Sequence, residues 1–211
     1  DGVEVSGVVL YDFFRGESPK QRVDAMNKAI EVLNRDAPEL MRVLPGTGGL
    51  SSILDAIEAG VDIVDSDFAF VLSRFGFTLD VKPMDFFELE SVSGGGGEGG
   101  DEGGDGSAGV EGGGRKRIPS KRSVRDPTWA RDMGPMQKGC GCFACAPDDM
   151  ADTRHSKAYV SHLIAEHEIL GEALLLIHNL WQLGAVFQAA RRAIDNDTLP
   201  QWLQWMRETY M

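Results

Sequence analysis

Short apolar runs alternate with helical apolar spacing along the first third of the chain. The apolar runs are rich in β-branched residues and predict three buried strands, over residues 2–11, 40–44 and 61–64. The segments between them predict two helices, of which the first begins at Ser18-Pro19 and the second ends at Gly60. This order predicts parallel βαβ units, because parallel neighbours need a long crossover connection.

The remaining pattern predicts one more strand and a largely helical end. Residues 75–79 alternate between apolar and small or polar positions, which predicts a strand or hairpin arm. Three helices are expected after residue 150, over about 156–176, 180–194 and 199–210. The longest apolar stretch, 169–177, is interrupted by Glu172 and ends at His178, so we predict no membrane-spanning helix.

Composition divides the chain in the middle. Of 26 glycines, thirteen lie between Gly94 and Gly114, together with five acidic residues. Six basic residues follow between Arg115 and Arg125. One interpretation is a flexible, solvated linker, and the other is a basic arm that contacts phosphates. The net charge of −12 argues against a protein that coats nucleic acid non-specifically.

The three cysteines carry the strongest chemical signal. Cys140, Cys142 and Cys145 form a C-x-C-x2-C pattern, whose short loops let three thiolates converge on one metal ion. Sulfur donors with one imidazole favour structural Zn²⁺. The spacing alone leaves the fourth ligand open among four histidines: His155, His162, His167 and His178. His178 is attractive because it lies at the predicted break between two helices.

The segment that contains this pattern resembles the zinc subdomain of the queuine and archaeosine tRNA-guanine transglycosylases. The matching residues after the cysteines are Ser156-Lys157-Ala158-Tyr159, His162-Leu163, Glu168-Ile169-Leu170 and His178-Asn179. The resemblance implies that Cys140, Cys142, Cys145 and His178 bind Zn²⁺. Residues 146–154 are an insertion relative to the family pattern, and we expect it to lie in a loop.

The resemblance extends upstream, where it weakens at the catalytic positions. Residues 60–66 resemble the family's G-V-D-x-F-D strand, whose last aspartate, here Asp65, is the nucleophile in catalytic members. The Pro-Thr-Arg that follows in those members is replaced by Ala69-Phe70-Val71. Ser6 and Thr47 also replace, respectively, a pocket glycine and a turn valine. Asp65 is therefore interpreted either as a strand-end carboxylate that caps a loop or as a surviving nucleophile.

These departures are similar to those of the eukaryotic accessory subunits of this family. The resemblance implies an α/β fold, the C-terminal part of a (β/α)8 TIM barrel with a zinc-binding subdomain. The expected organisation is partial barrel units over 1–90, a disordered insert over 91–125, and the zinc subdomain with C-terminal helices over 126–211.

The resemblance also implies partners and a place in the cell. The partners are tRNA and a catalytic subunit, in a heterodimer that exchanges guanine for queuine during queuosine biosynthesis. We expect a cytoplasmic protein, associated peripherally with the mitochondrial outer membrane and not integrated into it. Two alternatives stay open: a divergent catalytic subunit that uses Asp65, and a zinc-stabilised interaction module outside tRNA modification.

Overall fold

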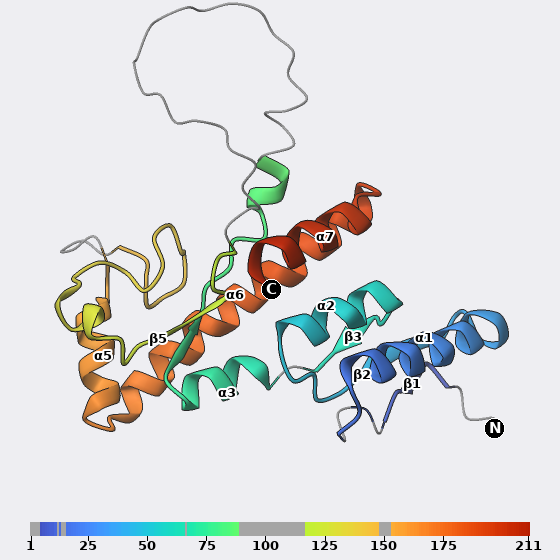
Figure 1. Ribbon diagram of the computed structural model, residues 1–211, viewed down its shortest axis with the longest axis horizontal. Helices are drawn as coiled ribbons and strands as arrows, with labels where there is room; N and C mark the ends of the chain where they lie inside the picture. The colour runs from blue at the N-terminus through green and yellow to red at the C-terminus, as the bar shows by residue number, and fades with distance from the viewer. Residues whose placement is uncertain (1–4, 12, 14–15, 66, 89–116, 148–152) are drawn as a thin grey trace, which may run out of the picture.

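A computed structural model describes most of the chain (Figure 1). The described residues are 5–11, 13, 16–65, 67–88, 117–147 and 153–211. The glycine run, residues 1–4, Ser66 and most of the predicted insertion at 146–154 lie outside them. Predictions made for those positions therefore stay predictions.

The first part of the chain forms parallel βαβ units, which confirms the predicted order. Its elements are β1 (Gly7–Val9), α1 (Pro19–Asp36), β2 (Met41–Leu44), α2 (Leu50–Ala59) and β3 (Ile63–Val64). The strands form a parallel sheet in the order β1-β2-β3, with Val9 opposite Val43 and Val43 opposite Ile63. Ser18 caps α1 as predicted, and Gly60 ends α2 in the left-handed conformation, with φ of 91°.

The second part builds a small hairpin and a helical layer. Its elements are α3 (Phe68–Arg74), β4 (Phe77–Leu79), β5 (Lys121–Ser123), the 3-10 helix η1 (Pro127–Arg131), α5 (Lys157–Ala165), α6 (Ile169–Asp195) and α7 (Leu199–Tyr210). Residues 85–88 are also helical. The expected hairpin arm is present, because β4 pairs with β5 in antiparallel fashion, with Thr78 opposite Arg122.

This pairing corrects the predicted extent of the insert. We expected a disordered segment up to residue 125, yet Lys121–Ser123 form a strand. The side chain of Arg122 forms an ion pair with Asp80, and the Lys121 ammonium lies 5.5 Å from the centre of the Phe77 ring. Residues 121–123 form a strand because β4 offers an edge for pairing. The charge and glycine content of the segment cannot indicate such a partner. The end of the basic block therefore belongs to the folded hairpin.

The helix boundaries around His178 also differ from the prediction. The expected break at His178 does not exist, because α6 runs without interruption from Ile169 to Asp195. The break instead lies at Glu166–Glu168, where His167 takes a left-handed conformation with φ of 58°. His178 and Asn179 are both fully buried. In sequence, a buried polar pair inside a helix has the same pattern as a helix end.

Helix α6 joins two of the hydrophobic clusters. Near its start, Leu174 and Leu175 pack in a cluster with α5 and the cysteine loop. Near its end, Val186 and Ala193 pack with α2, α3 and α7 around the fully buried Trp202. A third cluster fills the space between α1, α2 and the parallel sheet. In Figure 1, α6 runs from the cysteine loops toward α7.

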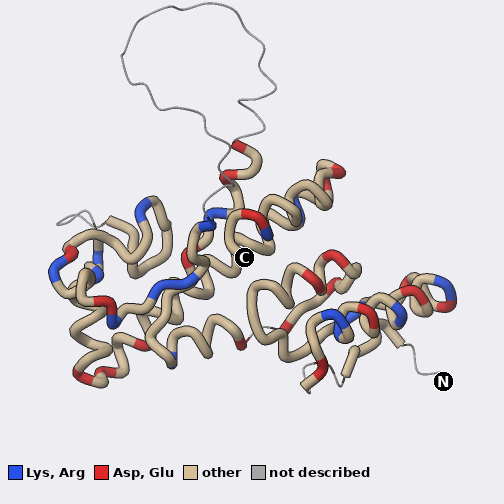
Figure 2. The backbone as a smooth tube through the Cα atoms, in the orientation of Figure 1, with Lys and Arg blue, Asp and Glu red and all other residues tan. Residues whose placement is uncertain are grey.

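The length of α6 also changes the membrane prediction. Within the described residues, α6 is the one helix long and apolar enough to cross a membrane by length and composition. The apolar segment was expected to end at His178, but the helix continues to Asp195 and contains no Asp, Glu, Lys or Arg between Glu172 and Arg191 (Figure 2). Core helices of water-soluble proteins pass the same test, so a single such helix is weak support for a membrane span. In α6, 44% of the apolar window is buried against the rest of the chain.

Candidate metal centre

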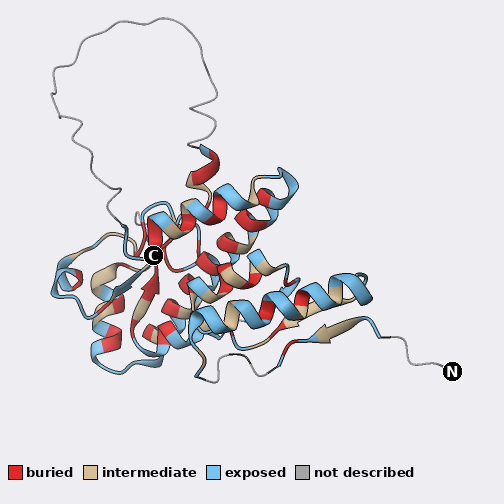
Figure 3. Cartoon of the chain, turned by 45° about the vertical axis from the view of Figure 1, so that its right-hand side comes forward, coloured by how far each residue is buried: buried red, intermediate tan, exposed pale blue. Residues whose placement is uncertain are grey.

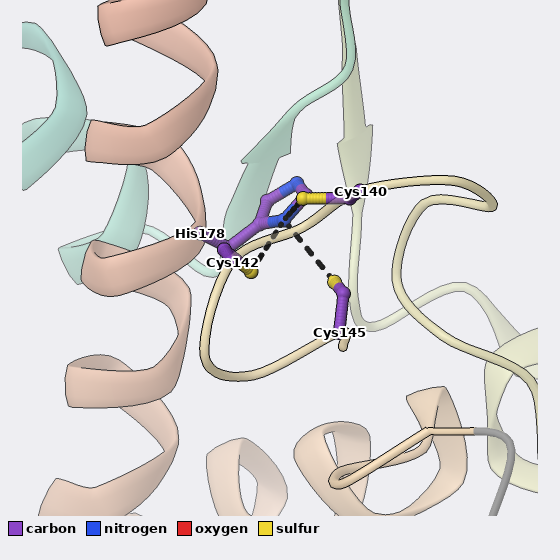
Figure 4. Close-up of side chains that lie close together, drawn as sticks. All are labelled: Cys140, Cys142, Cys145 and His178. Atoms are coloured by element: carbon purple, nitrogen blue, oxygen red, sulfur yellow. Dashed lines mark hydrogen bonds between the residues drawn. The ribbon is translucent and has the colours of Figure 1, made fainter. Parts of the chain in front are cut away.

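Three cysteines and one histidine meet between a loop and the middle of α6 (Figure 4). The loop turns back on itself after Cys142, whose carbonyl accepts hydrogen bonds from the backbone N–H groups of Cys145 and Ala146, at 3.1 and 2.8 Å. This turn directs the side chains of Cys142 and Cys145 toward His178. The four potential ligand atoms lie within 4.8 Å of one another.

The distances fit a tetrahedral metal ion. His178 Nδ1 lies 3.6, 3.7 and 3.4 Å from the Sγ atoms of Cys140, Cys142 and Cys145. Ligands at tetrahedral angles, with Zn–S near 2.3 Å and Zn–N near 2.0 Å, would place nitrogen and sulfur about 3.5 Å apart. Cys142, Cys145 and His178 are buried, and Cys140 is partly exposed. The group could therefore hold a metal ion and is compatible with zinc.

The outer contacts orient the ligand atoms. His178 Nε2 lies 3.1 Å from the backbone carbonyl of Leu79. Because a carbonyl oxygen can only accept, Nε2 carries the proton, and Nδ1 of the neutral ring is left free for a metal. One turn further along α6, Gln182 donates from Nε2 to Cys140 Sγ, at 3.3 Å. Helix α6 thus supplies one potential ligand and the residue that orients another.

The electrostatics of the cluster favour a cation. Contacts from Cys142 and Cys145 hold the pKa of Cys140 far below its usual range. Contacts with Cys140 and Cys142 raise the pKa of Cys145 above its usual range. Burial alone would lower the pKa of His178, but hydrogen bonds and negative charge from Cys140 and Cys142 outweigh it and raise this pKa to about 9. The protons held by these cysteine and histidine side chains would have to leave when a metal ion binds.

Two glycines fit the loop around Cys140. Gly139 has a φ of 81°, the left-handed region in which glycine is favoured. At Gly141, a Cβ atom would lie 3.0 Å from the indole of Trp181, so the loop needs a residue without a side chain to approach α6 this closely. Both glycines therefore permit the short loops that the cysteine spacing predicts.

Asn179 was not predicted to have a role of its own, and it connects the centre to the rest of the fold. Its Oδ1 accepts from the backbone N–H of Leu79 at 2.6 Å, and its Nδ2 donates to the Phe77 carbonyl and to Ser73 Oγ, both at 3.0 Å. It thereby ties α6 to both β4 and α3. The available signal was a cluster of polar residues, His178, Asn179 and Gln182, inside an otherwise apolar helix.

The other histidines do not join the cluster. His162 and His167 are exposed. His155 stacks on the ring of Tyr159, with ring centres 5.6 Å apart. Among the four histidines, all of which the structure describes, His178 alone lies with the three cysteines.

Asp65 lies at the carboxyl end of the parallel sheet, away from this cluster in sequence. Its backbone N–H donates to the Leu44 carbonyl at 3.0 Å, and its carbonyl accepts from Thr47 Oγ1 at 3.0 Å. Thr47, which stands where the family pattern has valine, is fully buried by this contact. The residue Asp65 itself is exposed. The residues that replace Pro-Thr-Arg lie in α3, where Phe70 and Val71 are 54% and 39% exposed.

Comparisons with known proteins give one consistent result. A family model described as queuine tRNA-ribosyltransferase matches residues 1–211. Similar relatives are named queuine tRNA-ribosyltransferase accessory subunit 2. That of Anopheles gambiae is 42% identical over 166 residues, which cover 76% of this chain and 30% of the relative. That of Danio rerio is 29% identical over 204 residues, covering 92% of this chain and 46% of the relative.

The match to Drosophila melanogaster shows the same difference in length. This relative is 26% identical over 178 residues, which cover 84% of the chain but 34% of the relative. The chain thus spans less than half the length of these curated relatives.

Proposed function

Because the chain belongs to the queuine tRNA-ribosyltransferase family, we propose that it is part of a non-catalytic accessory subunit. This subunit pairs with a catalytic subunit, and the heterodimer exchanges guanine for queuine at wobble position 34 of tRNA. The observation that carries the proposal is the shared name of the relatives, accessory subunit 2, from insects to fish. The name implies a complex in which another subunit performs the chemistry.

The surroundings of Asp65 support a non-catalytic role. A nucleophilic carboxylate needs partners that hold ribose and base in line with it. Here the helix that follows β3 offers Phe70 and Val71 to solvent in place of the family's threonine and arginine. The side chain of Val71 cannot donate a hydrogen bond or carry positive charge, so it cannot stabilise an anionic group as that of arginine does.

We propose that Zn²⁺ is held by Cys140, Cys142, Cys145 and His178. Four protein ligands close the coordination shell, which is the arrangement of structural rather than catalytic zinc. When bound, the ion would link the cysteine loop to the middle of α6. Since Asn179 ties the same helix segment to β4 and α3, this link would stabilise the whole C-terminal half.

The wider architecture follows from the family. Residues 1–90 would be the last units of a (β/α)8 barrel, residues 126–211 the zinc subdomain with the closing helices, and the glycine-rich insert would separate them. The basic residues within 115–125 and the zinc subdomain are proposed to help hold tRNA. We further propose a cytoplasmic location, with peripheral association with the mitochondrial outer membrane.

One observation favours a second candidate, a divergent catalytic subunit. Asp65 is exposed and directly follows β3, at the carboxyl ends of parallel strands, where the active sites of barrel enzymes lie. In that case Asp65 would form a covalent bond to the ribose of tRNA. A third candidate, an interaction module outside tRNA modification, would bind neither tRNA nor a catalytic partner.

Co-purification and activity separate these candidates. The full-length protein is expressed with and without the catalytic subunit from the same organism, and the incorporation of labelled guanine into tRNA is measured. We expect co-purification in a 1:1 complex, activity in the complex, and none in this protein alone. Activity of this protein alone would support the catalytic candidate, and failure to bind both partner and tRNA would support the third.

A further inference from the structure

Cys140 differs from the other potential metal ligands in its exposure. It is partly exposed, whereas Cys142, Cys145 and His178 are at most 2% exposed. Residues 138–141 all reach solvent to some degree, and Figure 3 shows the loops beside α5 mainly in the colours of exposed and intermediate residues. A dissolved reagent therefore meets the cluster first at Cys140.

Two hollows of the surface meet at Cys140. One, of about 340 Å³, is also lined by Trp181 and Gln182 of α6. The other, of about 940 Å³, is lined on its far side by Met133. Cys145 borders this larger hollow too, but with only 2% of its surface exposed. Both hollows are far larger than the roughly 30 Å³ that a water molecule occupies in the liquid, so molecules of that size can approach Cys140 from either side.

The sulfur atoms also lie close enough to react with one another. The potential ligand atoms lie within 4.8 Å of one another, and Figure 4 shows Cys142 and Cys145 facing the same point as Cys140. Cysteines that bind a metal are thiolates, and the thiolate is the form of cysteine that reacts with oxidants. An accessible thiolate with a second sulfur beside it is the arrangement found in cysteines that sense oxidants. The metal centre thus contains a site of attack and a partner for a disulfide.

We propose that hydrogen peroxide oxidises the metal centre at Cys140 and that the reaction releases the metal ion. The Cys140 thiolate attacks one oxygen of the peroxide, the O–O bond breaks and hydroxide leaves, so the sulfur is oxidised to sulfenic acid and the peroxide is reduced. The thiolate of Cys142 or Cys145 then attacks this sulfur, the disulfide forms, and the S–O bond breaks with loss of a second hydroxide. The ion keeps two of its four ligands and dissociates.

This inference rests on the proposed zinc site and adds its regulation. The change stays local, because the hydrogen bonds of Asn179 with Leu79, Phe77 and Ser73 involve no sulfur atom. These contacts keep α6 joined to β4 and α3 when the ion leaves, while the cysteine loop loses its metal link to the helix. A reductant that restores the thiols restores the site, so the centre is a reversible redox switch.

Peroxide treatment of the full-length protein, purified with its metal, tests this proposal. Zinc is first measured by elemental analysis, and a chromophoric chelator then reports the zinc that peroxide releases. In a parallel sample dimedone traps sulfenic acid, and mass spectrometry of peptides locates it. We expect trapping at Cys140 to be at least about tenfold faster than at Cys142 or Cys145, because access controls the reaction. Released zinc and disulfide should appear in equal amounts.

Two matched variants extend the test. Cys140→His and Cys142→His each leave two cysteines and two histidines, a ligand set that also holds zinc. Cys140→His lacks the exposed sulfur, so peroxide should release zinc at least about tenfold more slowly than from the unsubstituted protein. Cys142→His keeps Cys140 and should release zinc at a rate within about threefold of the unsubstituted protein. If either variant fails to bind zinc, trapping in the unsubstituted protein decides alone.

Several results would overturn the proposal. Equal trapping at the three cysteines, or earlier trapping at a buried one, would show that Cys140 is not the point of attack. A disulfide without zinc release, or zinc that does not bind again after reduction with a dithiol, would show that the centre is not a switch. A protein without zinc before peroxide is added would contradict the proposed metal site itself, and the initial elemental analysis separates that failure from the others.

Discussion

His178 Nε2 binds the backbone carbonyl of Leu79 at 3.1 Å, across 99 positions of sequence. The contact orients the imidazole so that Nδ1 points toward three thiols. The next residue of α6, Asn179, accepts from the N–H of the same Leu79. One residue of β4 therefore sets the position of both, and the metal centre is fixed by the hairpin as much as by its own loop.

Replacing His178 should remove the metal. In His178→Ala the three sulfur atoms lose their fourth partner, and bound zinc should fall from about one ion per chain to well below half, because closed four-ligand sites depend on every ligand. Unfolding should become easier by at least about 3 kcal/mol. Elemental analysis and thermal unfolding measure the two effects. The exposed His162→Ala is the control and should retain the metal; loss of metal in both variants would contradict the assignment.

Zinc affinity should rise with pH. In the metal-free site His178 has a pKa of about 9, so below pH 9 a proton must leave it before a metal binds. This group alone makes affinity about tenfold higher at pH 8 than at pH 7, and thiol protons can only add to the change. Competition with a chromophoric chelator measures the affinity at both values. An affinity independent of pH would show that no ligand proton is displaced.

Asn179→Ala should destabilise the protein without removing a ligand. The substitution leaves the N–H of Leu79 and the carbonyl of Phe77 without their partner in a buried region. We expect a loss of about 2–4 kcal/mol in the free energy of unfolding. Urea denaturation of the metal-loaded protein measures it. Gln188→Ala, exposed on the same helix, should change the value by less than about 0.5 kcal/mol; similar effects at both positions would rule out the network.

Two glycines of α6 should respond in opposite directions to alanine. At Gly171 a Cβ would lie 3.0 Å from Leu163 Cβ and 3.1 Å from the backbone nitrogen of Ile164, so Gly171→Ala should cost about 1–3 kcal/mol. At Gly184 a Cβ meets nothing within 4 Å, and Gly184→Ala should stabilise by up to about 1 kcal/mol through helix propensity. Thermal unfolding of both variants compares them directly. A stabilising Gly171→Ala would show that α5 and α6 are not closely packed.

Local patterns predicted the parallel strands, β4, the start of α1, the end of α2 and the cysteine loop. Ser18 and Gly60 mark helix boundaries through interactions with their own neighbours, so sequence suffices there. The choice of His178 as the fourth potential ligand came from family resemblance, because the spacing of the cysteines left four histidines open. The prediction of a helix break at His178 was wrong for a physical reason. The polar side chains of His178 and Asn179 form hydrogen bonds with Leu79 of β4, about a hundred residues away, and local periodicity cannot reveal such a partner.

The predicted extent of the insert was wrong for the same reason, a partner that is distant in sequence. Lys121–Ser123 is charged and follows a glycine-rich run, which favours a linker by composition. It forms a strand because Phe77–Leu79 offers an edge and Asp80 offers a counter-charge for Arg122. Long-range pairing of this kind determines structure where local propensity is weak.

The most direct test of the accessory role is guanine exchange by the heterodimer carrying Asp65→Asn. The full-length protein with this substitution is paired with an unchanged catalytic subunit, and incorporation of labelled guanine into tRNA is measured beside the unsubstituted complex. If this chain is non-catalytic, the rate should stay within about twofold of the unsubstituted rate. A loss of about a hundredfold or more, with the complex still assembled, would identify Asp65 as a nucleophile and contradict the accessory role.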